Sequence, residues 1–389
     1  MTSPPQDMSR RRRLLFRCAA ILAGFSVSFV SLEVVFCFYK PFELRVRGGR
    51  ISLPMNCTTV FSNHSFSKID PQVIQTRNSL GFRGKDPPAD FSKHLTIVTI
   101  GGSTTECFYL SDDRTWPARL GVKLAEKVPH VWINNAGLDG HSTHGHLYLL
   151  DQYVASLQPQ IALFLIGLND VGNQGPLTFD KRLERTAHQG RNVVEKSYFF
   201  VLQHSAVLSL LDNFRRYRKA ARAGLTHANV DHHQLVLDAG NTRETSAEEW
   251  SQLLEQHRAK YLPHYEQRVR QLVKTCRTQS IEPVLLTQPA LYGPAMDDVT
   301  QVDLRLVNVH GMSGSTRWKV LELYNDVTRK VAHQERLLLI DLAAQMPKSS
   351  RYYYDYHHFT NEGADAVADL IDDELTVFLK RHFTTANGD

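Results

Sequence analysis

Five short apolar runs constrain the fold of this chain more than any other feature of its sequence. Each run has four to six residues and is rich in aliphatic and β-branched side chains. Continuous apolar runs of this length are typical of strands that are buried on both faces of a parallel sheet. The runs are Leu95–Ile100, Val131–Asn134, Ile161–Ile166, Pro283–Thr287 and Leu337–Asp341.

Helical patterns lie between and after these runs. Strands that alternate with helices imply a parallel sheet with right-handed crossovers, in which ligands bind at the carboxyl ends of the strands. We therefore expect an α/β fold with a flavodoxin-like, doubly wound, five-stranded parallel sheet. Apolar residues recur at three- and four-residue spacing in Trp116–Ala125, Gly145–Leu157, Trp250–Cys276, Trp318–Ala332 and Gly363–Leu379.

The N-terminal segment differs from the rest of the chain. Four arginines, residues 10–13, precede an apolar run from Cys18 to Tyr39 whose one charged residue is Glu33. As a helix the run is about 33 Å long, which is enough to cross the hydrocarbon core of a bilayer. The basic cluster favours an N-terminus in the cytoplasm. We expect Glu33 near the outer end of the helix, where water reaches its carboxylate; pairing with another helix is the alternative.

A cleaved signal peptide is the other interpretation of this segment, but an Ala-x-Ala site is missing and the apolar run is too long for one. We therefore expect a signal anchor. The expected organisation is a basic cytoplasmic tail (1–13), a transmembrane helix (14–40), a lead-in segment that packs on the main domain (41–93) and the main domain itself (94–385). Asn56 and Asn63 begin glycosylation sequons, which matter only in a host that glycosylates such sites.

A long insertion, at about residues 172–248, separates the third run from the fourth. About 115 residues lie between these runs, far more than one crossover needs. Within them, Phe199–Phe214 is apolar and predicts a helix, and we expect the insertion to cap the functional site. A basic cluster follows, and it indicates either a solvated face or contact with anionic lipid or an acidic glycan. Its members are Arg215, Arg216, Arg218, Lys219 and Arg222.

Composition excludes several classes of protein. Five cysteines in 389 residues do not form a disulfide scaffold, and without a CxxC pair there is no zinc ribbon. The net charge of +5 is too small to indicate nucleic-acid binding. The 18 histidines, which include His141, His144, His146 and the pair His232 and His233, form no metal-binding signature such as HExxH, so we expect no metal and place them at the surface or in loops.

Four short segments that follow predicted strands or precede the last helix carry residues suited to catalysis. Ser103 follows two glycines where a helix begins, and free N–H groups there can face an oxyanion, although Ser103 could also be an ordinary helix cap. Asn169 ends the third strand and could donate to an oxyanion or satisfy a turn. Asp355 and His358 are three residues apart, so the carboxylate could orient the imidazole as a general base.

Together, in this order, the segments 101–106, 135–142, 167–170 and 354–363 resemble the SGNH (GDSL-type) hydrolase family over residues 75 to 380. The resemblance implies that Ser103 is the nucleophile and that Asp355 and His358 complete a catalytic triad. It also implies an oxyanion hole made by Ser103, Gly140 and Asn169, with Gly137 as the less favoured glycine. The segment 78–84 is similar to membrane-anchored bacterial members. One departure is Gly102, where the family's name motif has Asp.

The resemblance implies a serine ester hydrolase that needs no metal or organic cofactor, and from the small net charge we expect no binding to nucleic acid. Together with the anchor, the resemblance suggests a single-pass membrane protein whose main domain lies outside the cytoplasm. In a bacterium this would be the periplasmic or cell-surface side. The suggested reaction is the removal of O-acyl groups from envelope or exported polysaccharide. A lipid esterase or thioesterase, an O-acyltransferase and a catalytically silent glycan-binding protein are the alternatives. Gln288 and Tyr292 follow the fourth strand and could line the pocket, or belong to a loop stiffened by Pro289.

Overall fold

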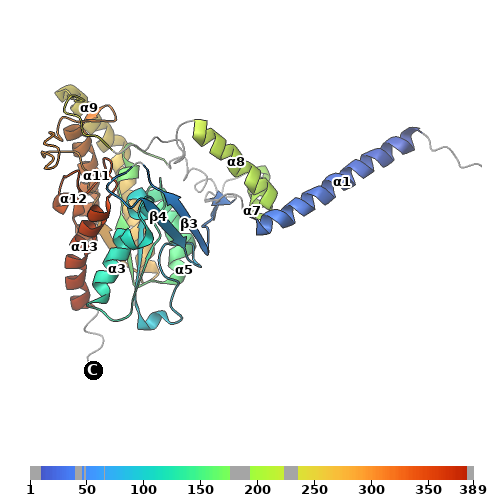
Figure 1. Ribbon diagram of the computed structural model, residues 1–389, viewed down its shortest axis with the longest axis horizontal. Coiled ribbons are helices and arrows are strands. Elements are labelled where there is room, and N and C mark those ends of the chain that lie inside the picture. The colour runs from blue at the N-terminus through green and yellow to red at the C-terminus, as the bar shows by residue number, and fades with distance from the viewer. Residues whose placement is uncertain are drawn as a thin grey trace, which may run out of the picture. The chain divides into compact units, whose positions relative to one another are not determined.

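The computed structural model describes residues 10–39, 46–47, 50–64, 66–175, 193–222 and 235–382 (Figure 1). The chain forms two compact units. One consists of residues 1–52 and 188–230, and the other of residues 53–187 and 231–389. The second unit contains the central sheet.

The central sheet has five parallel strands in the order β11-β8-β7-β5-β6. The first strand of this set in the chain therefore lies between the second and the third, which is the flavodoxin-like order. Every residue of β5 and β7 is buried, as expected for strands covered on both faces. This confirms the predicted fold class. The strands are β5 (Leu95–Gly101), β6 (Val131–Asn135), β7 (Ile161–Leu165), β8 (Glu282–Leu286) and β11 (Leu339–Ile340).

Helices occupy all five segments in which the sequence predicts them, with two interruptions. π-helical turns, η3 (Leu150–Val154) and η5 (His257–Tyr261), divide two of the predicted helices. Helix α13 packs against α3, and α10 packs against α4 and α11. The helices are α3 (Trp116–Ala125), α4 (Thr143–Leu149), α5 (Ala155–Leu157), α9 (Ala247–Gln256), α10 (Leu262–Thr278), α11 (Gly314–Glu335), α12 (Leu342–Gln345) and α13 (Asn361–His382).

The lead-in segment is more regular than the sequence indicates. It contains an antiparallel pair, β3 (Cys57–Ser62) and β4 (Gln72–Arg77), in which Cys57 lies opposite Arg77. The inward positions of β4 include the buried Gln75 as well as Val73. Because a polar residue takes an inward position, the alternation that marks a half-buried strand is absent from the sequence.

The first unit contains three helices among the described residues. Helix α1 (Arg10–Phe38) is long and apolar enough to cross a membrane, and no residue of its most apolar stretch is buried inside the protein. The apolar part of the insertion forms two helices, α7 (Val193–His204) and α8 (Ala206–Arg222), where we expected one. Helix α8 packs against both α1 and α7. The short strands β1 (Val46–Arg47) and β2 (Arg50–Ile51) pair with each other.

Candidate active site

Ser103 begins the short helix α2 (Ser103–Glu106), directly after strand β5. The N–H groups of Thr105 and Glu106 donate to the carbonyl of Gly102 at 3.0 and 2.9 Å. Ser103 comes before these two donors in the chain, so its N–H belongs to the first turn of the helix. N–H groups in the first turn have no acceptor within the helix. The structure therefore places the Ser103 hydroxyl and a first-turn N–H together at the carboxyl edge of the sheet.

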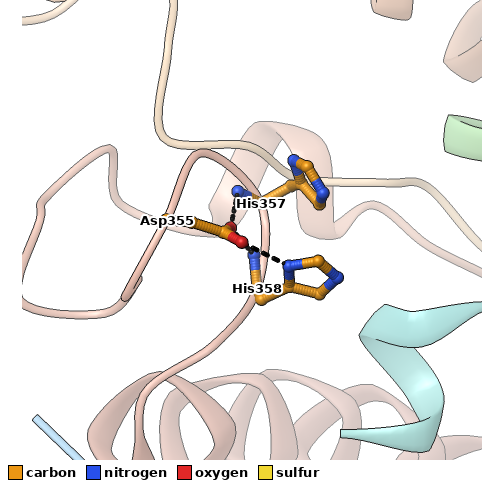
Figure 2. Close-up of side chains that lie close together, drawn as sticks. All are labelled: Asp355, His357 and His358. Carbon is orange, nitrogen blue, oxygen red and sulfur yellow. Dashed lines mark hydrogen bonds and ion pairs between the residues drawn. The ribbon is translucent and has the colours of Figure 1, made fainter. Parts of the chain in front are cut away.

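The loop before α13 carries Asp355 and His358. One carboxylate oxygen of Asp355 accepts the backbone N–H groups of His357 and His358 at 2.8 and 2.7 Å. The other lies 2.5 Å from Nδ1 of His358, as Figure 2 shows. Nε2 of the same ring lies 2.7 Å from Oγ of Ser103. Folding thus connects hydroxyl, imidazole and carboxylate in one chain of hydrogen bonds, although residues 103 and 358 are far apart in the sequence.

Burial and the neighbouring charges set the protonation states of Asp355 and His358. Burial disfavours the carboxylate of Asp355, but the rings of His358 and His357 and the hydrogen bonds to it hold its pKa well below the usual range. Burial also disfavours a charged His358, yet the Asp355 carboxylate outweighs it and raises the pKa of His358 above 6.5. An anionic Asp355 favours the tautomer of neutral His358 that carries its proton on Nδ1. That tautomer presents the Nε2 lone pair to Ser103, as a general base requires.

Asp355, His357 and His358 also form the one group of potential metal ligands among the described residues, with ligand atoms within 4.8 Å of one another. Both ring nitrogens of His358 and both oxygens of Asp355 already take part in hydrogen bonds. A metal ion would have to replace them. Burial lowers the pKa of His357 to about 4, so this ring is neutral at pH 7. The hydrogen-bonded arrangement is that of a proton relay.

Asn169 lies beside the nucleophile turn, in the 3₁₀ turn η4 (Leu168–Asp170) after β7. Its Nδ2 donates to the carbonyl of His141 at 2.9 Å, and an amide nitrogen has a second hydrogen to offer. A Cβ atom added to Gly102 would lie only 2.5 Å from this Nδ2. The missing side chain at position 102 therefore gives the Asn169 amide its place next to Ser103.

The structure separates the two glycines of the second segment. The N–H of Gly137 donates to Oδ1 of Asn135 at 2.9 Å, and a Cβ there would lie 2.4 Å from the backbone nitrogen of Glu106. Gly137 thus permits close packing against α2. Gly140 has a φ of 72°, and among the described residues its N–H has no acceptor. Of the two N–H groups, that of Gly140 is available to a ligand.

A buried ion pair holds the segments of Gly140 and Asn169 together. Asp170 accepts hydrogen bonds from the N–H and the hydroxyl of Thr143, the first residue of α4, at 3.2 and 2.5 Å. Nη2 of Arg268, from α10, lies 3.1 Å from the same carboxylate. Burial raises the pKa of Asp170, and the charge of Arg268 opposes this. Asp170 directly follows Asn169, and its hydrogen bonds to Thr143 therefore connect the Asn169 segment to α4, the helix that follows Gly140.

Arg83 supports the nucleophile helix α2. The sequence did not indicate this role, although the segment 78–84 resembles a family motif. The buried guanidinium donates to the carbonyls of Glu106 (2.6 Å), Cys107 (3.0 Å) and Leu110 (2.7 Å), and to the carboxylate of Asp112 (2.7 Å). It thereby satisfies carbonyl groups at and beyond the C-terminus of α2, which is the nucleophile helix.

Glu106, in the first turn of α2, connects this helix to two other segments. Its buried carboxylate lies 2.6 Å from Nη2 of Arg77 and accepts the N–H of Asp139 at 2.5 Å. It therefore joins the nucleophile helix to the loop of Gly140. The contact partners lie about 30 residues away in either direction, so no local pattern could reveal them.

Gln288 and Tyr292, which could line the pocket or belong to a stiffened loop, are both buried. Gln288 is 1% exposed and Tyr292 is 2% exposed. Oε1 of Gln288 accepts the hydroxyl of Thr104 at 3.0 Å, and its Nε2 donates to the carbonyl of Pro289 at 3.0 Å. Both side chains therefore lie in the interior. Gln288 thus supports Thr104, the residue next to Ser103.

The histidines expected at the surface or in loops are partly internal. His141 and His146 are buried, with ring centroids 6.5 Å apart, and burial lowers the pKa of His146 well below 6.5. His144 is half-buried. His232 and His233 lie outside the described residues.

Comparison with known proteins places this geometry in context. The model of the GDSL-like lipase/acylhydrolase family matches residues 99–366. No curated protein matches the chain. Among solved structures, an α/β hydrolase enzyme, LAE5, from the metagenome of Lake Arreo is 15% identical, with a TM-score of 0.40 over 74% of this chain and 97% of that one. Axe2, an acetylxylan esterase from Geobacillus stearothermophilus, is 14% identical (TM-score 0.40, 72% and 93% covered). A putative lipolytic protein of the G-D-S-L family from Desulfitobacterium hafniense is 11% identical (TM-score 0.38, 72% and 99%).

Proposed function

The chain belongs to the GDSL-like lipase/acylhydrolase family and is a carboxylic ester hydrolase; from this premise we propose that Ser103, His358 and Asp355 are its catalytic triad. The observation that carries the proposal is the unbroken hydrogen-bonded path from Oγ of Ser103 through the ring of His358 to Asp355, with distances of 2.7 and 2.5 Å. This is the arrangement in which an imidazole can accept the proton of an attacking hydroxyl.

In the proposed reaction, Oγ of Ser103 attacks the acyl carbonyl while Nε2 of His358 accepts the hydroxyl proton. Asp355 stabilises the resulting imidazolium, which is consistent with the raised pKa of His358. The imidazolium then donates its proton to the departing alcohol, and the carbon–oxygen bond of the ester breaks. A water molecule, deprotonated by His358, attacks the acyl-enzyme, releases the carboxylic acid and restores the serine.

The oxyanion that forms in each half-reaction needs hydrogen-bond donors. We assign this part to the N–H of Ser103, the N–H of Gly140 and Nδ2 of Asn169. The first two belong to backbone held by α2 and by the Glu106–Asp139 hydrogen bond, and the third is fixed by the carbonyl of His141. Donors that are already oriented stabilise the transition state without reorganisation, and the loss of one typically slows turnover by about 10²–10³-fold.

Hydrolysis of p-nitrophenyl acetate by the full-length protein in detergent tests the assignment. Ser103→Ala should lower the rate by about 10⁴-fold or more, because it removes the nucleophile. Ser156→Ala is the matched control, since the Ser156 hydroxyl is exposed and donates to the carbonyl of Tyr153. A fluorophosphonate probe should label the wild-type protein and not Ser103→Ala. A folded wild-type protein that takes no label would instead favour a non-catalytic glycan-binding function.

We further propose that the substrate is an O-acylated, for example acetylated, envelope or exported polysaccharide. The support is the length and apolar character of α1, together with the arginines before it, which favour a single-pass anchor with the catalytic unit outside the cytoplasm. In a bacterium this would be the periplasmic or cell-surface side. Acetate release from a panel of acetylated glycans, with Ser103→Ala as the control, tests this substrate class.

The same panel separates the alternatives. A lipid esterase or thioesterase would prefer long-chain acyl esters or thioesters, and an O-acyltransferase would move the acyl group to an added sugar in place of water. An internal acyl pocket built from residues 199–214 would have favoured the lipid substrate. The described side chains of this segment include the exposed Phe200, Leu211 and Phe214, so it gives no such support.

A further inference from the structure

Glu33, the one charged residue within the apolar run of α1, is bound to the start of α8. Its carboxylate accepts the N–H groups of Ala206 and Val207 at 2.7 and 3.3 Å and also the hydroxyl of Ser205. N–H groups at a helix N-terminus have no acceptor within their own helix, and the helix dipole favours a negative charge there. Glu33 thus pairs with another helix, which was the less favoured of the two expectations.

This contact fixes the depth of α8 once α1 spans a membrane. Glu33 lies five residues before Phe38, the last residue of α1, so it is about 7.5 Å from the end of the helix. A carboxylate at that depth is costly unless it has partners. Because α8 supplies the partners, its N-terminus must lie at the level of the outer leaflet whenever Glu33 does.

The surface of the α7–α8 hairpin suits that position. Seven of its described side chains are large, apolar and exposed; Phe200, for example, is 63% exposed. Soluble proteins rarely leave many large apolar side chains of one element uncovered. On α7, Val193 and Phe200 are seven residues apart and lie on the side of the helix opposite the buried Leu202, whereas Tyr198 lies next to Leu202. The exposed apolar residues of the hairpin are Val193, Val194, Tyr198, Phe200, Val201, Leu211 and Phe214.

The charged residues of α8 are also arranged as a membrane-binding helix would require. On α8 the exposed residues Leu211, Phe214, Arg215 and Arg218 are spaced i, i+3, i+4 and i+7, so they share one face. The apolar pair lies toward Glu33 and the two arginines toward the far end. The guanidinium of Arg218 lies 5.9 Å from the centre of the Phe214 ring. Apolar residues followed by arginines on one face are typical of helices that bury their apolar part in acyl chains and place their cations among lipid phosphates.

We propose that the α7–α8 hairpin is a second membrane-binding element, docked on α1 through Glu33 and inserted into the outer leaflet beside it. Its ligand is the bilayer itself: acyl chains for the apolar residues and anionic lipid phosphates for Arg215 and Arg218. The inference rests on the proposed spanning of the membrane by α1. The chain enters the hairpin after the segment of Asn169 and, by Leu235, has returned to the site, because the N–H of Leu235 donates to the carbonyl of Tyr354 at 3.2 Å. The catalytic unit is therefore connected to the proposed membrane-bound unit through the insertion as well as through its N-terminus.

Site-directed fluorescence of the full-length protein in vesicles tests the proposal. The accessible thiols of Cys18, Cys37 and Cys57 are first replaced by serine, while the buried Cys107 and Cys276 stay. An environment-sensitive nitrobenzoxadiazole label is then placed at Phe200→Cys, at Phe25→Cys in the middle of α1 or at Ser251→Cys on α9. The vesicles contain phosphatidylcholine and phosphatidylglycerol, with or without a quencher on the acyl chains.

We expect the label at position 200 to shift to shorter wavelengths and to be quenched almost as strongly as the label at position 25, whereas the label at 251 gives the unquenched baseline. A label at 200 that matches this baseline while the label at 25 is quenched would overturn the inference and leave the anchor intact. If the label at 25 also matches the baseline, α1 does not span the bilayer, and the proposed anchor fails together with the inference.

Two further variants examine the contacts themselves. Glu33→Leu removes the acceptor of the α8 N-terminus and should reduce quenching at position 200 without changing it at position 25. Arg215→Gln combined with Arg218→Gln should abolish the dependence of quenching at 200 on the phosphatidylglycerol fraction. Unchanged quenching in both variants would contradict the docking and lipid contacts proposed here. Hydrolysis of p-nitrophenyl acetate at the parent rate shows that each variant is folded, since none of these residues belongs to the catalytic site.

Discussion

At the scale of single residues, Gly102 shows how a departure from a family motif can be accommodated. The family's name motif has an acidic residue before the nucleophile, and here the space for that side chain is taken by Nδ2 of Asn169. The amide can lie against the nucleophile turn because position 102 has no Cβ. The departure therefore belongs with the proposed oxyanion hole and does not weaken the assignment of Ser103.

Gly102→Ala tests this relation. A methyl group 2.5 Å from Nδ2 would displace the Asn169 amide, while the φ of −85° is accessible to alanine. We expect kcat for p-nitrophenyl acetate to fall by about 10²–10³-fold, as after loss of one oxyanion donor. Asn169→Ala should cause a loss of the same order, and the double variant should be little worse than either single one. Additive losses would show that the two residues act independently.

The pH dependence of the reaction is a second prediction at this scale. The general base must be neutral, and Asp355 raises the pKa of His358 above 6.5. Activity should therefore rise with pH through an apparent pKa above 6.5. Asp355→Asn removes the charge that favours the imidazolium, so the rise should move to lower pH, while kcat falls by about 10⁴-fold. The pH profile of kcat/KM measures both effects; an unshifted profile would show that Asp355 does not set the pKa of His358.

At the scale of elements, the site depends on hydrogen bonds and an ion pair of buried charged residues, which join helices and loops that are distant in sequence. Arg83 holds the end of α2, Glu106 joins α2 to the loop of Gly140, and Asp170 joins the segment of Asn169 to α4 and α10. Strands β5, β6 and β7 deliver three of the segments to one edge of the sheet, the loop before α13 brings the fourth, and the buried charges fix the first three relative to one another. The contact partners are separated by 23 to 98 positions in the sequence, and the sequence around them contains no periodic signal.

Arg268→Leu should destabilise the protein strongly, because it leaves the carboxylate of Asp170 buried without a counter-charge. Breaking a buried pair in this way typically costs about 3–5 kcal/mol. Arg277→Leu on the same helix is the matched control: Arg277 is 48% exposed and pairs with Glu335, and an exposed pair typically contributes about 0–1 kcal/mol. Guanidinium unfolding in detergent, followed by tryptophan fluorescence, gives both values. Similar costs for the two variants would contradict the importance assigned to Asp170.

At the scale of the whole molecule, the chain combines a catalytic unit with a second unit made of α1 and the α7–α8 hairpin. Residues 53–187 and 231–389 form the catalytic unit, so the polypeptide passes from one unit to the other three times. The hairpin is an insertion between the third and fourth strands of the sheet. The insertion that we expected to cap the active site is thus, in its described helices, part of the unit that contains the N-terminal helix.

The orientation of the chain in a membrane is testable with its own sequons. Asn56 is exposed and lies beyond the end of α1, whereas the Asn63 side chain is bonded to the carbonyls of Phe66 and Asp70. If the C-terminal part is translocated, translation with endoplasmic-reticulum microsomes should give a glycosylated product. The Asn56→Gln variant should give less of this product or none. A product that remains unglycosylated and open to added protease would place the catalytic unit on the cytoplasmic side.

The sequence alone determined the strands, most of the helices, the family and the small set of residues from which a serine hydrolase site could be built. It could do so because burial on both faces of a sheet leaves apolar runs that are local, and because Ser103, Asn169, Asp355 and His358 each lie in a recognisable short segment. Only the tertiary structure decided which glycine keeps a free N–H, that Gln288 and Tyr292 are internal, and that Glu33 binds the start of α8. Each of these depends on which partner arrives from a distant part of the chain, and hydrogen bonds between such partners leave no periodic pattern in the sequence.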